Sequence, residues 1–142
     1  MTKILVPVDG SQSCLRAVDH VIARSKRTQQ ALELHLLAVH PPIPYANAIA
    51  AIGTEAANRF YREEGNAALK VARERLDAAA VAYRHHISFG DPADVISRFV
   101  RENQISEVIM GTRGMGAVSN LLLGSVASKV IHLVDVPVTL VK

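Results

Sequence analysis

The hydrophobic residues of the chain fall into short continuous runs that alternate with segments of helical spacing. Five runs have the length and the β-branched content that are typical of strands. Four of them are strongly apolar: KILVPV at 3–8, LELHLLAV at 32–39, SEVIMG at 106–111 and VPVTLV at 136–141. The fifth, VAYRHHIS at 81–88, is more polar and is predicted to lie at an edge of the sheet.

The segments between these runs have helical patterns. After Ser11, one predicted face carries a set of apolar or small residues: Leu15, Val18, Ile22 and Ser25. A second helix is predicted to end at about Ala80. A third has a strong start signal, with Asp91 as N-cap followed by Pro92 at the first helical position. The last is predicted from about Gly124 to Leu133.

Strands that alternate with helices predict an α/β fold, with a parallel sheet, right-handed crossovers and helices on both faces. In such sheets a ligand lies beyond the carboxyl ends of the strands, where the strand order reverses. This rule places Asp9, Val39 and Gly111 around one crevice. The segment 40–54 carries three prolines, and a connection of that length is usually functional or mobile.

Composition narrows the function classes. The 142 residues fit one domain, residues 1–142, with 49% apolar and 20% charged residues. The net charge of +3 comes without a Lys/Arg cluster, so we expect small anions as partners and no nucleic acid. The single Cys14 excludes an internal disulfide. No run has the roughly 20 apolar residues of a membrane span, and we expect no membrane insertion and a cytoplasmic protein.

The segment 109–131 contains four glycines but neither a P-loop nor a dinucleotide-binding fingerprint. It lacks the Gly-Lys pair of a P-loop, and the first strand–helix turn lacks GxGxxG. Gly111 and Gly114 would nevertheless let the backbone take positive φ and approach a ligand, while Gly124 and Ser125 open a helix whose amides attract anions. Arg113 would add a cation. The alternative is a glycine-rich turn shaped only for close strand–helix packing.

The spacing Gly111-x-x-Gly114, nine residues, then Gly124-Ser125 is similar to the G-2x-G-9x-G-[S/T] signature of the ATP-binding universal stress proteins. The resemblance covers essentially the whole chain. The segments that carry it are ILVPVDGS at 4–11, GDPADVI at 90–96, LLLGSVASKVI at 121–131 and VPVTLVK at 136–142.

The resemblance implies a single-domain, Rossmann-like, open twisted sheet of five parallel strands in the order 3-2-1-4-5, with ATP or ADP between strands one and four. Asp9 would contact the ribose or the adenine edge, Pro7 and Val8 would line the base, and the backbone at Val39 would address the adenine. A further set would hold the phosphates: Gly111, Gly114, Gly124, Ser125 and Val126. Arg113 lies at a variable position of the signature. Mg²⁺ would be held through the phosphates, and strand 137–141 would form a homodimer.

Other residues have simpler interpretations. The alternative to ligand contact for Asp9 is a role as cap of the first helix, for which Ser11 is the other candidate. Cys14 is predicted to be a buried small hydrophobic residue. The six histidines lack the spacing of a metal site. No general base or transition-state clamp is evident. We therefore expect a nucleotide-dependent sensor or switch in stress response, acting on an unknown client protein. The alternatives are a slow ATPase and a nucleotide-independent dimeric interaction protein.

Overall fold

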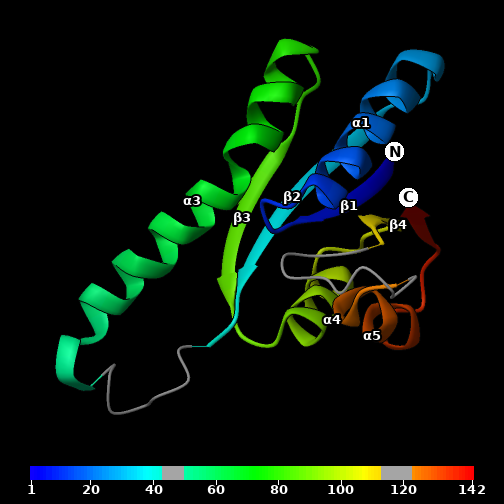
Figure 1. Ribbon diagram of the computed structural model, residues 1–142. Helices are drawn as coiled ribbons and strands as arrows, with labels where there is room; N and C mark the ends of the chain where they lie inside the picture. The colour runs from blue at the N-terminus through cyan, green and yellow to red at the C-terminus, as the bar shows by residue number, and fades with distance from the viewer. Residues whose placement is uncertain (43–49, 113–122) are drawn as a thin grey trace.

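The computed structural model describes residues 1–42, 50–112 and 123–142. Its strands and helices alternate along the chain (Figure 1). The strands are β1 (Thr2–Val8), β2 (Leu32–His40), β3 (Arg84–Phe89), β4 (Glu107–Gly111) and β5 (Val138–Val141). The helices are α1 (Gln12–Arg27), α3 (Thr54–Ala78), α4 (Pro92–Glu102) and α5 (Ser125–Leu133). None of these helices is both long and apolar enough to cross a membrane.

The five strands form one sheet in the order β3-β2-β1-β4-β5, and every neighbouring pair is parallel. The predicted fold class and strand order are therefore confirmed. β1 lies at the centre, where Val6 pairs with Leu36 of β2 and Leu5 pairs with Val108 of β4. The more polar strand β3 lies at one edge, as its composition predicts, and β5 lies at the other.

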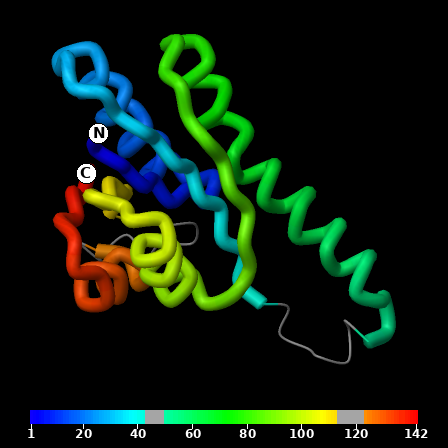
Figure 2. The backbone as a smooth tube through the Cα atoms, turned by 180° about the vertical axis from the view of Figure 1, so that it is seen from behind, coloured from blue at the N-terminus to red at the C-terminus, as the bar shows by residue number. Residues whose placement is uncertain are grey.

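Helices cover both faces of the sheet, and each face has its own hydrophobic core (Figures 1 and 2). Because side chains alternate along a strand, Ile4 and Val6 face α1 and α3, whereas Leu5 faces α4 and α5. Leu69 of α3 and Ile96 of α4 are buried on opposite faces. The strands of the centre are thus buried on both sides, which explains their continuous apolar runs.

The predicted helix starts are confirmed, and one ambiguity is resolved. Ser11 rather than Asp9 is the N-cap of α1, since its hydroxyl accepts a hydrogen bond from the Cys14 amide at 3.2 Å. Asp91 caps α4 by accepting from the Asp94 amide at 3.2 Å, and Pro92 begins the helix. The face of α1 differs slightly from the prediction, because Val21 is buried while Ile22 is only half-buried.

Helix α3 is much longer than the strand beside it. Its 25 residues extend about 38 Å, whereas the six residues of β3 extend about 20 Å. Figure 1 shows the first turns of α3 continuing past the carboxyl end of β3. The beginning of α3 therefore borders the edge of the sheet at which ligands of this architecture bind.

The end of α3 carries a backbone strain. Ala80 adopts φ = 55°, the left-handed conformation that glycine usually supplies after a helix. The turn is closed by two backbone bonds, from the Val81 amide to the Leu76 carbonyl at 3.0 Å and from the Ala80 amide to the Asp77 carbonyl at 3.1 Å. An alanine Cβ is crowded in this conformation, so the turn is held by its hydrogen bonds against a local cost.

We expect Ala80→Gly to raise the free energy of unfolding by about 0.5–1 kcal/mol, because glycine removes the left-handed strain. The matched control is Ala67→Gly, an exposed position within the same helix, where the same change should lower stability by about 1 kcal/mol. Urea unfolding followed by circular dichroism measures both. A loss of stability in Ala80→Gly equal to that of the control would contradict the prediction.

Candidate functional site

The carboxyl ends of β2, β1 and β4 lie side by side at one edge of the sheet, because the three strands are parallel neighbours. Val39, Asp9 and Gly111 stand at or just after these ends. The crossover from β1 leads to β2 on one side, and β4 lies on the other, so the strand order reverses here. The structure thus brings together the three positions that the sequence pattern places around one crevice.

Asp9 begins the turn between β1 and α1 and is exposed. Its Oδ1 accepts a hydrogen bond from the Ser11 amide at 2.9 Å, which shapes the turn and places Ser11 as the helix cap. Gly10 takes φ = 82°, so the turn depends on a glycine at this position. Asp9 therefore has a local structural role and is also exposed just after the carboxyl end of β1.

Gly111 provides the close approach between β4 and α1. A Cβ at this position would lie 2.2 Å from Ser13 Oγ and 2.5 Å from the Ser13 carbonyl oxygen. Gly111 is not among the described glycines with positive φ, so the expectation of a left-handed conformation is wrong for this residue. The alternative of close strand–helix packing accounts for it, because the space beside its Cα is filled by Ser13.

The two ends of the glycine segment are joined by one backbone hydrogen bond. The Gly124 amide donates to the Thr112 carbonyl at 2.5 Å. Thr112 is buried, and the sequence contains no signal for this contact, since the two residues meet only when β4 and α5 are in place. The bond brings the first turn of α5 to the carboxyl end of β4.

The first turn of α5 has no side-chain cap. Gly124 is the N-cap, and among the described residues no side-chain cap hydrogen bond is made to this helix start. Ser125 is exposed and Val126 is half-buried. Since the first amides of a helix have no carbonyl partner within the helix, this end presents donors and a positive dipole to an anion.

The remaining predicted residues are placed as follows. Pro7 and Val39 are half-buried, and both lie on the face of the sheet that α4 and α5 cover. The side chain of Val8 is buried in the core against α1 and α3, which leaves its backbone as the part nearest the crevice. Arg113 and Gly114 lie outside the described residues.

An aromatic cluster that no sequence pattern predicts lies at the carboxyl ends of β2 and β3. Tyr61 of α3 stacks on Phe89 with ring centroids 4.7 Å apart, and His40 packs edge-on against Tyr61 at 5.3 Å. Phe60 joins the cluster, 5.4 Å from His40. This aromatic wall joins the beginning of α3 to the carboxyl ends of β2 and β3.

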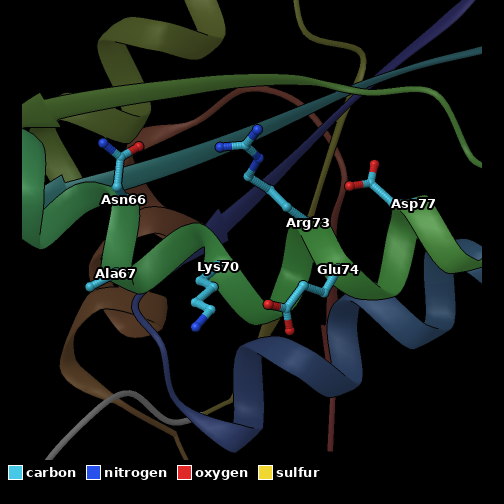
Figure 3. A pocket seen from close by; sticks show the side chains of 6 residues that line it. All are labelled: Asn66, Ala67, Lys70, Arg73, Glu74 and Asp77. Atoms are coloured by element: carbon cyan, nitrogen blue, oxygen red, sulfur yellow. The ribbon is translucent and has the colours of Figure 1, made fainter.

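Surface hollows occur elsewhere. One follows α3 and is lined by Asn66, Ala67, Lys70, Arg73, Glu74 and Asp77. Figure 3 shows that these side chains spread to both sides of the one helix and do not converge on a point. A second hollow lies between the last turns of α1 and α3, at the amino-terminal end of β2. We assign function to neither, because the side chains that line the first diverge and the second lies at the amino-terminal end of β2, away from the candidate site.

One further expectation, the burial of Cys14, is confirmed by the geometry. Cys14 is buried, its Sγ donates to the Ser11 carbonyl at 3.1 Å, and desolvation raises the pKa of its thiol. The thiol is therefore an inert part of the core. In the part of the chain that the structure describes, no group of three or more His, Cys, Asp or Glu side chains is arranged to hold a metal ion.

Comparisons with known proteins agree on one family. The family model "Universal stress protein family" matches residues 1–142. The chain is 31% identical over 140 residues to Universal stress protein MJ0531 of Methanocaldococcus jannaschii, covering 99% of this chain and 81% of that protein. Hypothetical protein MJ0577 has a similar structure, with a TM-score of 0.80, 28% identity and coverage of 99% and 95%. A universal stress protein solved in complex with cAMP has a TM-score of 0.66, 25% identity and coverage of 99% and 96%.

We expect Gly111→Ala to destabilise the fold by about 1–3 kcal/mol, because the new methyl group would force α1 away from β4. Thermal unfolding of the protein without added ligand measures this effect. Adding Ser13→Ala should not restore stability, since the Ser13 carbonyl would still lie 2.5 Å from the new Cβ. Full rescue by Ser13→Ala would show that the hydroxyl alone makes the contact.

Proposed function

Because the chain belongs to the universal stress protein family, we propose that it binds an adenine nucleotide at the carboxyl ends of β1 and β4 and uses it as a regulatory ligand. The observation that carries this proposal is the uncapped first turn of α5, which the bond between Gly124 and Thr112 holds beside the end of β4. A helix start without a side-chain cap, placed at the reversal of strand order, suits a phosphate group.

The phosphate contacts follow from this helix start. The Gly124 amide already donates to Thr112, so the available donors are the amides of Ser125 and Val126 and the exposed Ser125 hydroxyl. Gly114 and Arg113, outside the described residues, complete the phosphate contacts in the proposal. Mg²⁺ would be held through the phosphates of ATP or ADP, since no described side-chain cluster offers it a site.

The base and the ribose are proposed to lie between this helix start and the aromatic wall. Asp9 is exposed at the mouth of the crevice and would accept from the ribose hydroxyls or from the edge of the base. Pro7, Val8 and the backbone of Val39 stand beside it at the ends of β1 and β2. The relative solved with cAMP at 25% identity supports an adenine nucleotide as the ligand class.

A regulatory role is favoured over rapid turnover. The Asp9 carboxylate is committed in part to the Ser11 amide, and the His40 Nδ1 atom contacts the Pro41 carbonyl at 2.6 Å. Both groups thus make local contacts, and we propose no general base among the described residues. Binding energy without such a group holds a nucleotide but does not accelerate its hydrolysis. We therefore propose a sensor or switch, whose alternative remains a slow ATPase.

The helix start provides a test on two matched variants. Ser125→Pro removes one backbone donor at the first helical position, where proline is well tolerated, and Gly124 already has the extended backbone that precedes a proline. We expect the affinity for Mg-ATP or AMP to fall by about 10- to 100-fold, because a hydrogen bond to a charged group is lost. Ser125→Ala keeps the amide and should lose less.

Isothermal titration calorimetry measures these affinities, and mass spectrometry of the denatured protein identifies any nucleotide that copurifies. Equal affinities of wild type and Ser125→Pro would exclude the α5 helix start as the phosphate site. Absence of binding to the wild type in both measurements would exclude the nucleotide proposal and favour the nucleotide-independent interaction protein.

The second part of the proposal is a homodimer through β5. This strand pairs with β4 on one side and is the edge of the described sheet on the other. The Val108 amide donates to the Pro137 carbonyl at 3.0 Å and Val108 pairs with Val138, so the parallel ladder directs the Thr139 amide toward β4. The backbone groups of Val138 and Leu140 therefore point outward, toward a second copy.

We expect the protein to be a dimer at micromolar concentration and Leu140→Pro to shift it toward the monomer, because the proline removes an outward donor. Thr139→Ala is the matched control. It removes the hydroxyl that donates to Glu107 at 2.9 Å and keeps every backbone donor, so its dimer should persist. Analytical ultracentrifugation decides between these outcomes, and a monomeric wild type would contradict the proposed interface.

A further inference from the structure

Three polar side chains form a hydrogen-bonded chain across β2 and the edge strand β3, on the face that α4 covers. The His35 Nε2 atom lies 2.8 Å from Glu33 Oε1, and the His35 Nδ1 atom lies 3.0 Å from His86 Nε2. His35 is only 4% exposed. The two imidazoles stack with an interplanar angle of 16°, and Phe99 of α4 packs edge-on against both rings.

The geometry limits how many protons this chain can hold. With both rings neutral, the His35 Nε2–H donates to Glu33 and the His86 Nε2–H donates to the bare His35 Nδ1. One additional proton is accommodated, because a single imidazolium can still donate to the bare nitrogen of the other ring. A second additional proton would set two N–H groups against each other across 3.0 Å, with no acceptor between them.

The surrounding charges do not offset this conflict. β1 contributes Lys3 beside Glu33, and β3 contributes Arg84 on the same face and His85 on the opposite face. α4 presents the apolar ring of Phe99, while its charged side chains are exposed: Asp94, Arg98, Arg101 and Glu102. Glu33 is thus the acidic group that contacts the pair, and the contact engages the far nitrogen of His35.

We propose that Glu33, His35 and His86 form a proton-operated latch that holds the edge strand β3 and helix α4 to β2 at neutral pH and releases them at mildly acidic pH. The release follows from the second added proton, which the paired rings exclude and the separated rings accept. Opening uncovers the edge of β2, which β3 otherwise occupies from His35 to His40. The latch is independent of the proposed nucleotide site.

The pKa directions agree with this geometry. Burial lowers the pKa of His86, and the neighbouring charges of His35, His85 and Arg84 lower it further. The hydrogen bond from His35 lowers the pKa of Glu33, which keeps this carboxylate charged as the pH falls. The pKa of His86 is lower in the closed state than in the open state. Its contribution to the stability of the closed state is therefore fully present above the ordinary histidine pKa of about 6.5, and this contribution is lost as the pH falls below that value.

The test compares two neighbouring histidines. His86→Gln keeps a partner for His35 in either protonation state, since an amide both donates and accepts, but it removes the second charge. His85→Gln changes the adjacent residue on the opposite face, near Tyr83, and leaves the latch intact. Amide hydrogen exchange of β3 and α4, corrected for the intrinsic effect of pH, reports the opening of each variant at pH 7.5, 6.5 and 5.5.

In the wild type and in His85→Gln, we expect the opening constant of β3 to rise about fivefold between pH 6.5 and 5.5, as one proton is taken up by a group with a pKa of about 6.5 in the open state. In His86→Gln it should change little. An equal acid response in all three proteins would overturn the proposal, as would loss of the response in His85→Gln. Ring-nitrogen NMR of the wild type gives a second test: two additional protons on His35 and His86 at pH 5.5, with β3 still protected, would also overturn it.

Discussion

The pairing and burial of β1 is the constraint on which the rest of the structure depends. This strand hydrogen-bonds to β2 on one side and to β4 on the other, and Ile4, Leu5 and Val6 are completely buried on its two faces. A buried backbone amide without a partner costs more than a hydrogen bond returns, so β1 requires both neighbours. Each of its apolar side chains in turn requires a helix above it, and each contributes roughly 2 kcal/mol when buried. The five-strand order and the two helical layers follow from satisfying both demands.

The same arrangement creates the candidate site. Because β2 and β4 flank β1 in parallel, their carboxyl ends meet and the crossovers leave in opposite directions. The close approach of Gly111 to Ser13 draws α1 onto β4, and the bond from Gly124 to Thr112 draws the start of α5 to the same place. The carboxyl end of β4 is therefore flanked by two helix beginnings that packing has positioned. A regulatory ligand at this point would contact elements from both layers of the fold.

The two edges of the sheet differ in chemistry, and this difference separates their roles. β5 is short and apolar, and its outward backbone groups suit pairing with another strand. β3 carries Arg84, His85 and His86, and its attachment depends on polar contacts as well as on Ile87 in the core. A hydrophobic attachment is insensitive to pH, whereas a hydrogen bond between two imidazoles is not. The polar edge is thus the part of the sheet at which protonation can act.

Local signals in the sequence determined the elements of this protein. The apolar runs predicted the strands, the cap at Asp91 predicted a helix start, and the polar run near His85 predicted an edge, because these properties arise from neighbours along the chain. The glycine spacing indicated the family, and the alternation of strands and helices predicted one ligand crevice. Only the tertiary structure decided that Gly111 serves contact with Ser13 without positive φ, that Thr112 closes on Gly124, and that His35 meets His86. Each of these contacts joins residues from separate elements. Their distances are set by how strands and helices pack, and a sequence pattern, which records only separation along the chain, carries no measure of them.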